Sequence, residues 1–384
     1  MKSISSRNLS LVSILSACVA AGVGMGLTLP LLSLVLERMG VAGSVNGLNL
    51  ATAGAAALFI TPQAPDLMRR FGASAFLAAC RFFAAVSLSA IYEAQNLCLC
   101  FPMRFILSAG LNGLFVVSEF WINQLADERS RGRMVALYAM CLSAGFGAGP
   151  ILLGLIGTHG IVPFAAGAAM LLLATIPVIL ARRGAPRIET SETHSIFSSM
   201  RSAPAILAAG LVFGAIDAGM AGLFPVYAVR NGYGEAEAAL CVTAMSIGGI
   251  VFQYPLGWIA DRIDRRTLLI LCAASGVLGA AVTPFVVHAP AAMYAVLVLW
   301  GGIIMGVYTV GLTLLGERFK GPRLASANAA YVMMYSMGMI VGPTIEGAGL
   351  DAWDPHGLLV ALGAISAAYA AFLALRKLQV SLSA

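Results

Sequence analysis

Charge is scarce in this sequence. Asp, Glu, Lys and Arg make up 10% of its 384 residues, whereas they make up about a quarter of an ordinary soluble domain. The signatures of several enzyme classes are also missing: there is no H-E-x-x-H zinc helix, no G-x-S-x-G nucleophile turn and no G-x-x-x-x-G-K-S/T phosphate loop. These absences argue against a soluble protein, against familiar hydrolases and against an ATP-driven pump.

Apolar residues take the place of charge. They account for 60% of the chain and give a mean hydropathy of +0.90. Stretches of about 20 apolar residues, each long enough to cross about 30 Å of hydrocarbon, recur along the whole chain and lack the alternation of barrel strands. Because backbone groups in lipid must bond within their own segment, we predict an all-α membrane protein with twelve transmembrane helices. The expected spans are residues 9–36, 45–64, 74–94, 97–124, 134–157, 161–181, 204–228, 238–259, 267–288, 291–316, 325–349 and 357–375.

Basic residues predict the topology. The first apolar stretch continues well past Cys18 and is too long for a signal peptide, so we expect an uncleaved first span. With both termini inside, 19 of the 23 basic residues fall on the cytoplasmic side, and only Arg38 and Arg230 fall on outside loops. This bias is what the positive-inside rule requires, and it places both termini in the cytoplasm. The net charge of +6 therefore reflects topology rather than nucleic-acid binding.

One phrase occurs twice in the chain. "YAMCLSAGFGAGP" at 138–150 and "YVMMYSMGMIVGP" at 331–343 align without a gap at an offset of 193 residues, about half the chain. Glycines four apart let helices pack backbone to backbone, and a proline inside a helix permits a bend. A purely structural kink is the alternative interpretation. The candidate hinge and helix-seam residues are Gly145, Gly149, Pro150, Gly338, Gly342 and Pro343.

The duplication predicts two six-helix halves, residues 1–181 and 204–384, joined by a cytoplasmic linker at 182–203 that is rich in Arg, Ser, Thr and Glu. Each half has a polar turn after its second span, "PQAPDLMRR" (62–70) and "GWIADRIDRR" (257–266). An aspartate there complements a neighbouring helix N-terminus, and arginines hold the turn in the cytosol. The candidate gate residues are Gly257, Asp261, Arg262, Arg265, Arg266, Asp66, Arg69 and Arg70.

These motifs carry a family resemblance that covers essentially the whole chain. "GWIADRIDRR" resembles the loop signature of the major facilitator superfamily, with Asp264 where glycine is usual, and the first-half copy is degenerate at Pro62 and Leu67. "GFGAGPILLG" (145–154) resembles the fifth-span signature of the proton-antiporter branches, and the segment 117–140 resembles the bacterial YcaD-like group. The resemblance implies that spans 5 and 11 lie at the seam between the halves and that spans 1, 4, 7 and 10 line a cavity.

Ionisable residues inside spans are functional candidates because they are costly in lipid. We predict that Asp217, in the middle of span 7, is the main proton-coupling or substrate-contacting acid. Glu119 in span 4 is the second candidate, and its alternative is an ion pair with a loop arginine. Arg104, where the antiporter branches also carry an arginine, lies 15 residues before Glu119, which places the two about 60° apart around a helix and able to face one cavity.

The other polar or sulfur-bearing side chains in the spans have plainer interpretations. Glu346 is expected at the outer interface, and Arg81 is expected to reach the cytosol with its long side chain. The pair Cys98 and Cys100 is a weak metal or disulfide signal and is read first as small buried hydrophobes. The methionines clustered in span 11 are read as packing residues, with copper handling as the alternative. No metal site and no cofactor is predicted.

We therefore predict a secondary active transporter that moves a small organic solute by alternating access, a proton-coupled efflux antiporter powered by the proton gradient alone. Its expected partners are the small-molecule substrate, protons and membrane lipids, without nucleic acid, and it is expected to act as a monomer. One alternative is a proton-driven uptake symporter. Another, from a different class, is a membrane receptor or enzyme that transports nothing.

Overall fold

The computed structural model describes residues 4–94, 96–125, 131–176, 203–320 and 322–382, and these residues form helices and connecting turns without a β-strand. Ten of the helices in this part of the chain are long and apolar enough to cross a membrane. The all-α fold class is thereby confirmed, with three differences of detail. Helix α6 (Val162–Leu173) is described over only 12 residues, and α14 (Pro322–Ala352) has 31 residues but a lower hydropathy, because small and polar residues interrupt it. Span 7 corresponds to two helices, α9 (Pro204–Gly222) and α10 (Phe224–Arg230).

Packing divides the chain into two compact units. The first unit comprises residues 1–32 and 55–190, and the second comprises residues 33–54 and 191–384. Helices α1 (Ile4–Arg38) and α2 (Gly43–Phe71) contribute to both, since their connected ends pack with the second unit. The predicted boundaries at 181 and 204 stay a prediction, because 182–202 of the linker lie outside the described residues.

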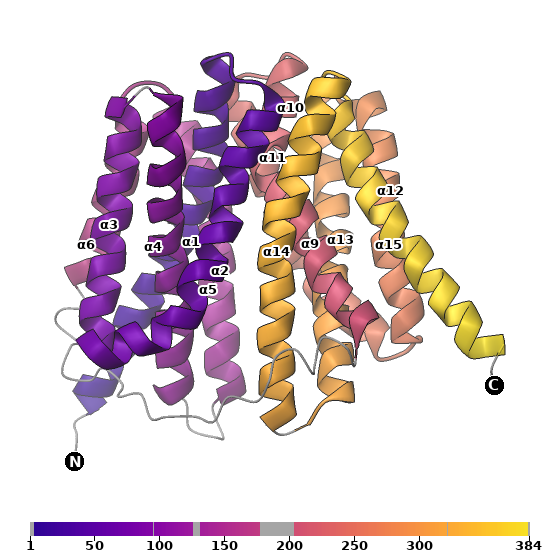
Figure 1. Cartoon of the computed structure of the whole chain (residues 1–384), viewed down its shortest axis with the longest axis horizontal. Coiled ribbons are helices and arrows are strands. Elements are labelled where there is room, and N and C mark those ends of the chain that lie inside the picture. Colours follow the sequence, from indigo (N-terminus) through magenta and orange to yellow (C-terminus); the bar gives the residue numbers. More distant parts are fainter. Residues whose placement is uncertain (1–3, 95, 126–130, 177–202, 321, 383–384) are drawn as a thin grey trace. The chain divides into compact units, whose positions relative to one another are not determined.

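The first unit is a helix bundle. It contains most of α1 and α2, together with α3 (Ala73–Ala94), α4 (Leu97–Leu125), α5 (Arg131–Ile156) and α6. Figure 1 shows α3 and α4 running side by side, and α3 also packs on α6. Helix α1 lies against α5 through glycines, since a Cβ on Gly22 or Gly26 would collide with the α5 backbone at Leu142 or Phe146.

The second unit is built around the contact of α9 with α14. Its other helices are α11 (Glu235–Ala260), α12 (Arg265–Val286), α13 (Pro290–Arg318) and α15 (Gly357–Leu382). Prolines in the first turn start α9 and α13, where a missing N–H costs nothing. Asp264 caps α12 by accepting bonds from the N–H groups of Arg266 and Thr267.

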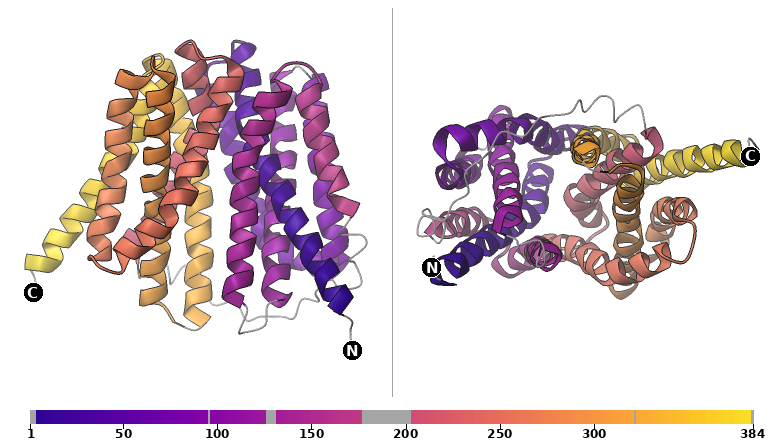
Figure 2. Two further views of the ribbon diagram at one scale, coloured as in Figure 1. Left: turned by 180° about the vertical axis from the view of Figure 1, so that it is seen from behind. Right: turned by 90° about the horizontal axis from the view of Figure 1, so that it is seen from below.

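Within the second unit the connections alternate between two ends. Residues 39–42, the α10–α11 turn and the α14–α15 turn lie at one end, which we call the hairpin end after the α1–α2 hairpin (Figure 1). The α11–α12 turn, the α13–α14 turn and the last residues of α15 lie at the other, which we call the basic end. The left view of Figure 2 shows the same order from behind, and the right view shows the helices end-on from below.

Candidate transport site

The helix pair α9–α14 is packed at backbone distance. A Cβ on Gly338 would collide with the backbone at Leu211, and one on Gly342 would collide with Ala215, both on α9. In return, a Cβ on Gly214 would collide with the α14 backbone at Tyr335. Gly338 and Gly342 of span 11 thus lie in a tight helix contact within the second unit, of the kind that small residues make possible in membranes. The predicted place of span 11 at the seam between the halves stays a prediction. Pro343 lies inside α14, and its counterpart Pro150 lies inside α5.

This packing brings Asp217 of α9 next to Tyr335 of α14. The Tyr335 hydroxyl donates a hydrogen bond to Oδ2 of Asp217 at 2.7 Å, and both side chains are partly exposed. Within the described residues, no Lys or Arg forms an ion pair with Asp217. The carboxyl group therefore has one neutral hydrogen-bond donor and no compensating positive charge among the described residues.

Other aromatic rings lie close to the ring of Tyr335. The ring of Phe213 lies 6.1 Å from that of Tyr335 and 5.4 Å from that of Tyr308, centroid to centroid. Tyr308 of α13 also lies 6.0 Å from Tyr335 and 5.3 Å from Tyr331. Three helices thus supply an acid and a group of rings, an arrangement that suits organic molecules with an apolar or cationic part.

The predicted residues of span 4 differ from one another in burial. Arg104 is 2% exposed, and its two terminal nitrogens have no hydrogen-bond partner among the described residues. Glu119, further along α4, is exposed. Both belong to the first unit and Asp217 belongs to the second, so the shared cavity of these three residues stays a prediction.

Two expectations for buried charges were wrong. Arg81 does not reach the aqueous boundary: it is fully buried in α3 and donates from Nη1 to the carbonyl oxygen of Ala174. Glu346 is fully buried as well, facing Gly219 of α9 rather than the interface. In both places a neighbouring helix covers the side chain, which the distance of a residue from the end of its span does not reveal.

The duplicated phrase is matched by duplicated contacts. The Tyr138 hydroxyl donates to the carbonyl oxygen of Phe115 at 3.4 Å, 23 residues earlier in α4. The Tyr331 hydroxyl donates to the carbonyl oxygen of Tyr308 at 3.0 Å, also 23 residues earlier, in α13. The tyrosine that opens each copy therefore ties the fifth span of its half to the fourth.

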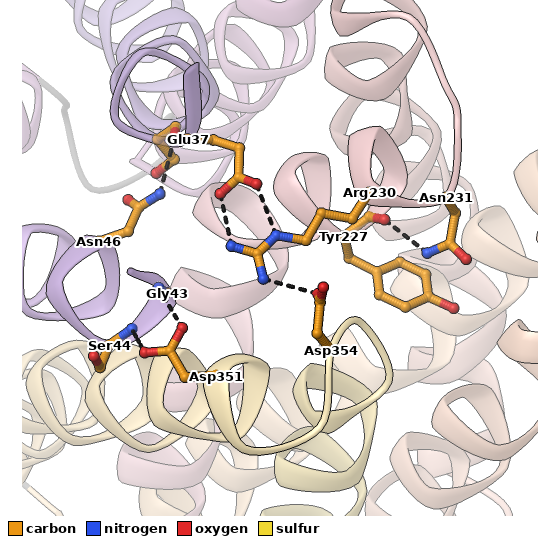
Figure 3. A network of polar contacts seen from close by, with 10 residues as sticks. Glu37, Gly43, Ser44, Asn46, Tyr227, Arg230, Asn231, Asp351 and Asp354 are labelled. Atoms are coloured by element: carbon orange, nitrogen blue, oxygen red, sulfur yellow. Dashed lines mark hydrogen bonds and ion pairs between the residues drawn. The ribbon is translucent and has the colours of Figure 1, made fainter. Parts of the chain in front are cut away.

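The hairpin end of the second unit carries an ion-pair network (Figure 3). Arg230 binds both carboxylate oxygens of Glu37, at 2.7 and 2.9 Å, and also Asp354 at 2.8 Å. Arg38 binds Glu235 at 2.6 Å. The hydrogen bonds to Glu37 raise the pKa of Arg230 above its ordinary value. Sequence reasoning missed this network, although it had a signal: Arg38 and Arg230 are the two basic residues that it placed on outside loops.

Asp351 completes this end with a backbone contact. Its two carboxylate oxygens accept hydrogen bonds from the N–H groups of Gly43 and Ser44, at 2.6 and 2.8 Å. These are the first residues of α2, whose N–H groups have no partner within the helix. A residue of α14 therefore caps α2.

At the basic end, the predicted gate residues form contacts within the α11–α12 turn and with the end of α13. Asp261 pairs with Arg265 at 3.3 Å, and Arg265 also pairs with Glu317 of α13. Arg262 lies over the ring of Trp258 at 3.6 Å. Within the second unit no atom lies within 4 Å of the position that a Cβ on Gly257 would take, so this glycine makes no close helix contact there.

The corresponding turn of the first unit is similar in its charge pairing. Asp66 binds Arg69 at 3.1 Å, and Arg70 lies over the Phe71 ring. The gate role of both turns stays a prediction. Among the described residues, His, Cys, Asp and Glu side chains form no group of three that suits a metal ion, and Cys98 and Cys100 are free thiols, the first exposed and the second buried.

Comparison with known proteins defines the class. The family model described as "Major Facilitator Superfamily" matches residues 13–313 and 221–381. The chain belongs to this superfamily, which is made up of transporters rather than enzymes.

Its curated relatives include the uncharacterised MFS-type transporter YfkF of Bacillus subtilis (strain 168), 25% identical over 88% of each chain. They also include YcaD of Escherichia coli (strain K12 / DH10B), 24% identical over 69% of each chain. The expected relation to the YcaD-like group is therefore confirmed.

Solved structures agree on the fold. The nucleoside transporter NupG superposes with a TM-score of 0.78 at 14% identity, over 98% of this chain and 99% of that one. A D-xylose–proton symporter superposes with a TM-score of 0.72 at 15% identity, over 95% and 96% of the two chains. At these identities the likeness concerns the fold.

Proposed function

We propose that this protein is a proton-coupled antiporter that exports a small organic solute across the bacterial inner membrane by alternating access. Membership of the family supports secondary transport, and one observation supports coupling to protons. Asp217 is a partly exposed carboxylic acid within a membrane-spanning helix, with a single neutral donor, Tyr335, and no cationic partner among the described residues. An acid in this setting has to face water, a proton or a ligand, because lipid does not solvate it.

The proposed chemistry is competition at one carboxyl group. When Asp217 is protonated, the neutral acid keeps the Tyr335 hydrogen bond and has little attraction for a cation. When it has lost the proton, the carboxylate attracts a cationic or hydrogen-bonding solute that lies against the rings of Phe213 and Tyr308. Alternating access with either a proton or the solute bound then gives exchange, and the proton gradient is the only energy source, without a cofactor.

The orientation follows from the two ends of the second unit. The basic end has many more Lys and Arg residues than Asp and Glu residues. We therefore assign it to the cytoplasm by the positive-inside rule. The hairpin end, where each Arg is matched by carboxylates, then faces outward. Reporter fusions after Thr190 and at Ala384 test this assignment. Both should report cytoplasm, and a periplasmic signal from either would overturn it.

Proton movement tests the coupling. Purified protein is reconstituted in liposomes that contain a pH-sensitive dye, and small organic solutes are added one at a time under an imposed pH gradient. An antiported solute should move protons out of an acidic lumen as the solute enters. A symporter would carry both in the same direction, and a receptor or enzyme would move neither.

The same assay, run with the first active solute, tests the residue. Asp217→Asn should abolish solute-dependent proton movement, whereas Glu93→Gln, at an exposed acid near the end of α3, should leave it unchanged. An Asp217→Asn variant that moves protons at the wild-type rate would show that the carboxylate is a structural hydrogen-bonding group, and the assignment would pass to Glu119.

A further inference from the structure

Glu346 of α14 is a buried acid that the proposed exchange does not use. Its side chain has no exposed surface, and neither carboxyl oxygen has a hydrogen-bond partner among the described residues. It faces Gly219 of α9, and a Cβ at that glycine would occupy the place of the Glu346 carboxyl group. The glycine therefore makes the room in which the acid is held.

Three segments meet around this carboxyl group. A Cβ on Gly222 of α9 would collide with the Leu50 side chain of α2, and one on Gly47 of α2 would collide with Pro343 of α14. Helix α2 thus packs against both α9 and α14. These contacts are close to the place where the Glu346 side chain lies between α9 and α14. Separation of α2 from α9 and α14 would open a path for water to the acid.

No charge compensates Glu346 in the closed arrangement. The described part of α2 in the second unit has no ionisable residue, and α9 has only Asp217. On α13 and α15 the charged residues lie at the basic end. The charged residues at the hairpin end are paired with one another or with backbone N–H groups. These residues are Glu317, Arg318, Arg376 and Lys377 at the basic end, and Glu37, Arg38, Arg230, Glu235, Glu237, Asp351 and Asp354 at the hairpin end, where Glu237 accepts a hydrogen bond from the N–H of Gly234. The histidines at the hairpin end are His288 and His356, and His356 contacts the Tyr227 hydroxyl.

We propose that Glu346 is a second proton-carrying residue, which links one proton to the opening of the hairpin end. An ionised carboxylate without a partner is strongly disfavoured in such a site, so the closed end contains the neutral acid. When α2 separates from α9 and α14, Glu346 transfers its proton to water and the carboxylate is hydrated. Closing requires one proton to return. The coupling between this proton and opening is a property of the protein without substrate. Only the role of that proton in exchange rests on the proposed transport function.

The linkage between proton release and opening determines how strongly opening depends on pH. If one proton leaves on opening, the ratio of open to closed protein rises by up to tenfold for each pH unit above the pKa of a hydrated glutamic acid, about 4.3. Opening can be followed by the labelling of a cysteine placed at Ala51, a buried residue of α2 one turn from Gly47. A cysteine at Ala42, which is exposed in the turn before α2, corrects for the pH dependence of the thiol chemistry. Mass spectrometry of the peptides separates both from the native cysteines.

The labelling ratio of Ala51→Cys to Ala42→Cys is measured between pH 6 and pH 8.5, in protein without substrate or gradient. It should rise with pH in the parent and in Asp217→Asn, and it should be low and independent of pH in Glu346→Gln. Gly219→Ala, which displaces the carboxyl group, should raise the ratio at every pH, whereas Gly222→Ala, which displaces only Leu50, should keep the pH dependence. A parent ratio that does not change with pH, or a Glu346→Gln variant that responds as the parent does, overturns the proposal. Neither result bears on whether Asp217 couples transport.

Discussion

The helix pairs α1–α5 and α9–α14 are two copies of one contact, and they differ in chemistry. In each pair, glycines of the later helix lie against the backbone of the earlier one: Gly145 against Val19 in the first unit, and Gly338 against Leu211 in the second. These contacts relate α1 to α9 by an offset of 192 residues and α5 to α14 by one of 193. The offsets place Met25 at the equivalent of Asp217, Leu142 at that of Tyr335 and Leu153 at that of Glu346.

The difference teaches that the scaffold and the site are constrained separately. Both helix pairs have to pack, so backbone contact at the glycines is required in both units, and both units have it. The acids are required only where a proton or solute is handled, and the second unit alone has them in this helix pair. The first unit carries its charged residues elsewhere, with Arg81 in α3 and Arg104 and Glu119 in α4.

The largest expected effect comes from moving the acid between the pairs. The double variant Asp217→Met with Met25→Asp should have no solute-driven proton movement, since Leu142 offers the transplanted acid no hydroxyl donor. Met25→Leu alone should keep wild-type activity. Wild-type activity in the double variant would show that the two helix pairs are interchangeable, and the distinction drawn between them would be lost.

A smaller effect is expected from the contacts that both pairs share. Gly338→Ala and Gly145→Ala should each lower the stability of the purified protein by roughly 1–3 kcal/mol, because each Cβ has to force two backbones apart. Gly316→Ala, in α13 with no atom within 4 Å of its Cβ position, is the matched control and should be neutral or slightly stabilising. Thermal unfolding in detergent measures all three. Loss of stability in only one of the two seam variants would show that the copies are not equivalent scaffolds.

The scaffold could be predicted from the sequence because its signals are local. A phrase repeated at a fixed offset identified Tyr138, Tyr331 and the seam glycines, and the apolar stretches identified the helices. Asp217 was a candidate because of its place in the middle of a span, and its role stays a prediction.

Its surroundings were not recognisable, because they depend on which helices are neighbours. Tyr335 is 118 residues from Asp217 in sequence, and nothing in its own span distinguishes it from the other tyrosines. The burial of Glu346 depends on a glycine of another helix. The ion pairs of Arg230 depend on residues from two further segments, 193 and 124 residues away.

The tyrosine that opens each copy gives a finer comparison. Tyr331→Phe and Tyr138→Phe each remove one hydroxyl hydrogen bond and leave the ring in place, so each should cost about 1 kcal/mol or less. The bond of Tyr331 is the shorter, at 3.0 Å against 3.4 Å for Tyr138, and its loss should be the more costly of the two. Unfolding midpoints of the two variants, measured side by side, check the order. A larger loss in Tyr138→Phe would contradict it.

The smallest effect is expected where the two polar turns differ. The first unit turns from α2 to α3 at Gly72, whose φ of 84° lies in the left-handed region. The second unit has Asp264 at the start of α12, and the hydrogen bond from the Thr267 hydroxyl, followed by those from Lys377 and two backbone N–H groups, lowers the pKa of this acid to about 2. A lowered pKa means that the ionised acid stabilises the fold above its unfolded pKa of about 3.9, and that this contribution is lost as the pH falls toward 2.

Asp264→Asn keeps a capping oxygen and removes the titration. Because Asp264 is largely exposed, the charge is screened, and the variant should be less stable by only a few tenths of a kcal/mol at pH 7. The difference from wild type should shrink between pH 5 and pH 2.5, because wild type loses the same charge there. Thermal unfolding of the two proteins across this range measures it, with Gly72→Asn in the first unit as the control whose effect should not depend on pH. A difference between wild type and Asp264→Asn that stays constant across the range would mean that Asp264 acts only as a neutral cap, and that the two turns differ in geometry alone.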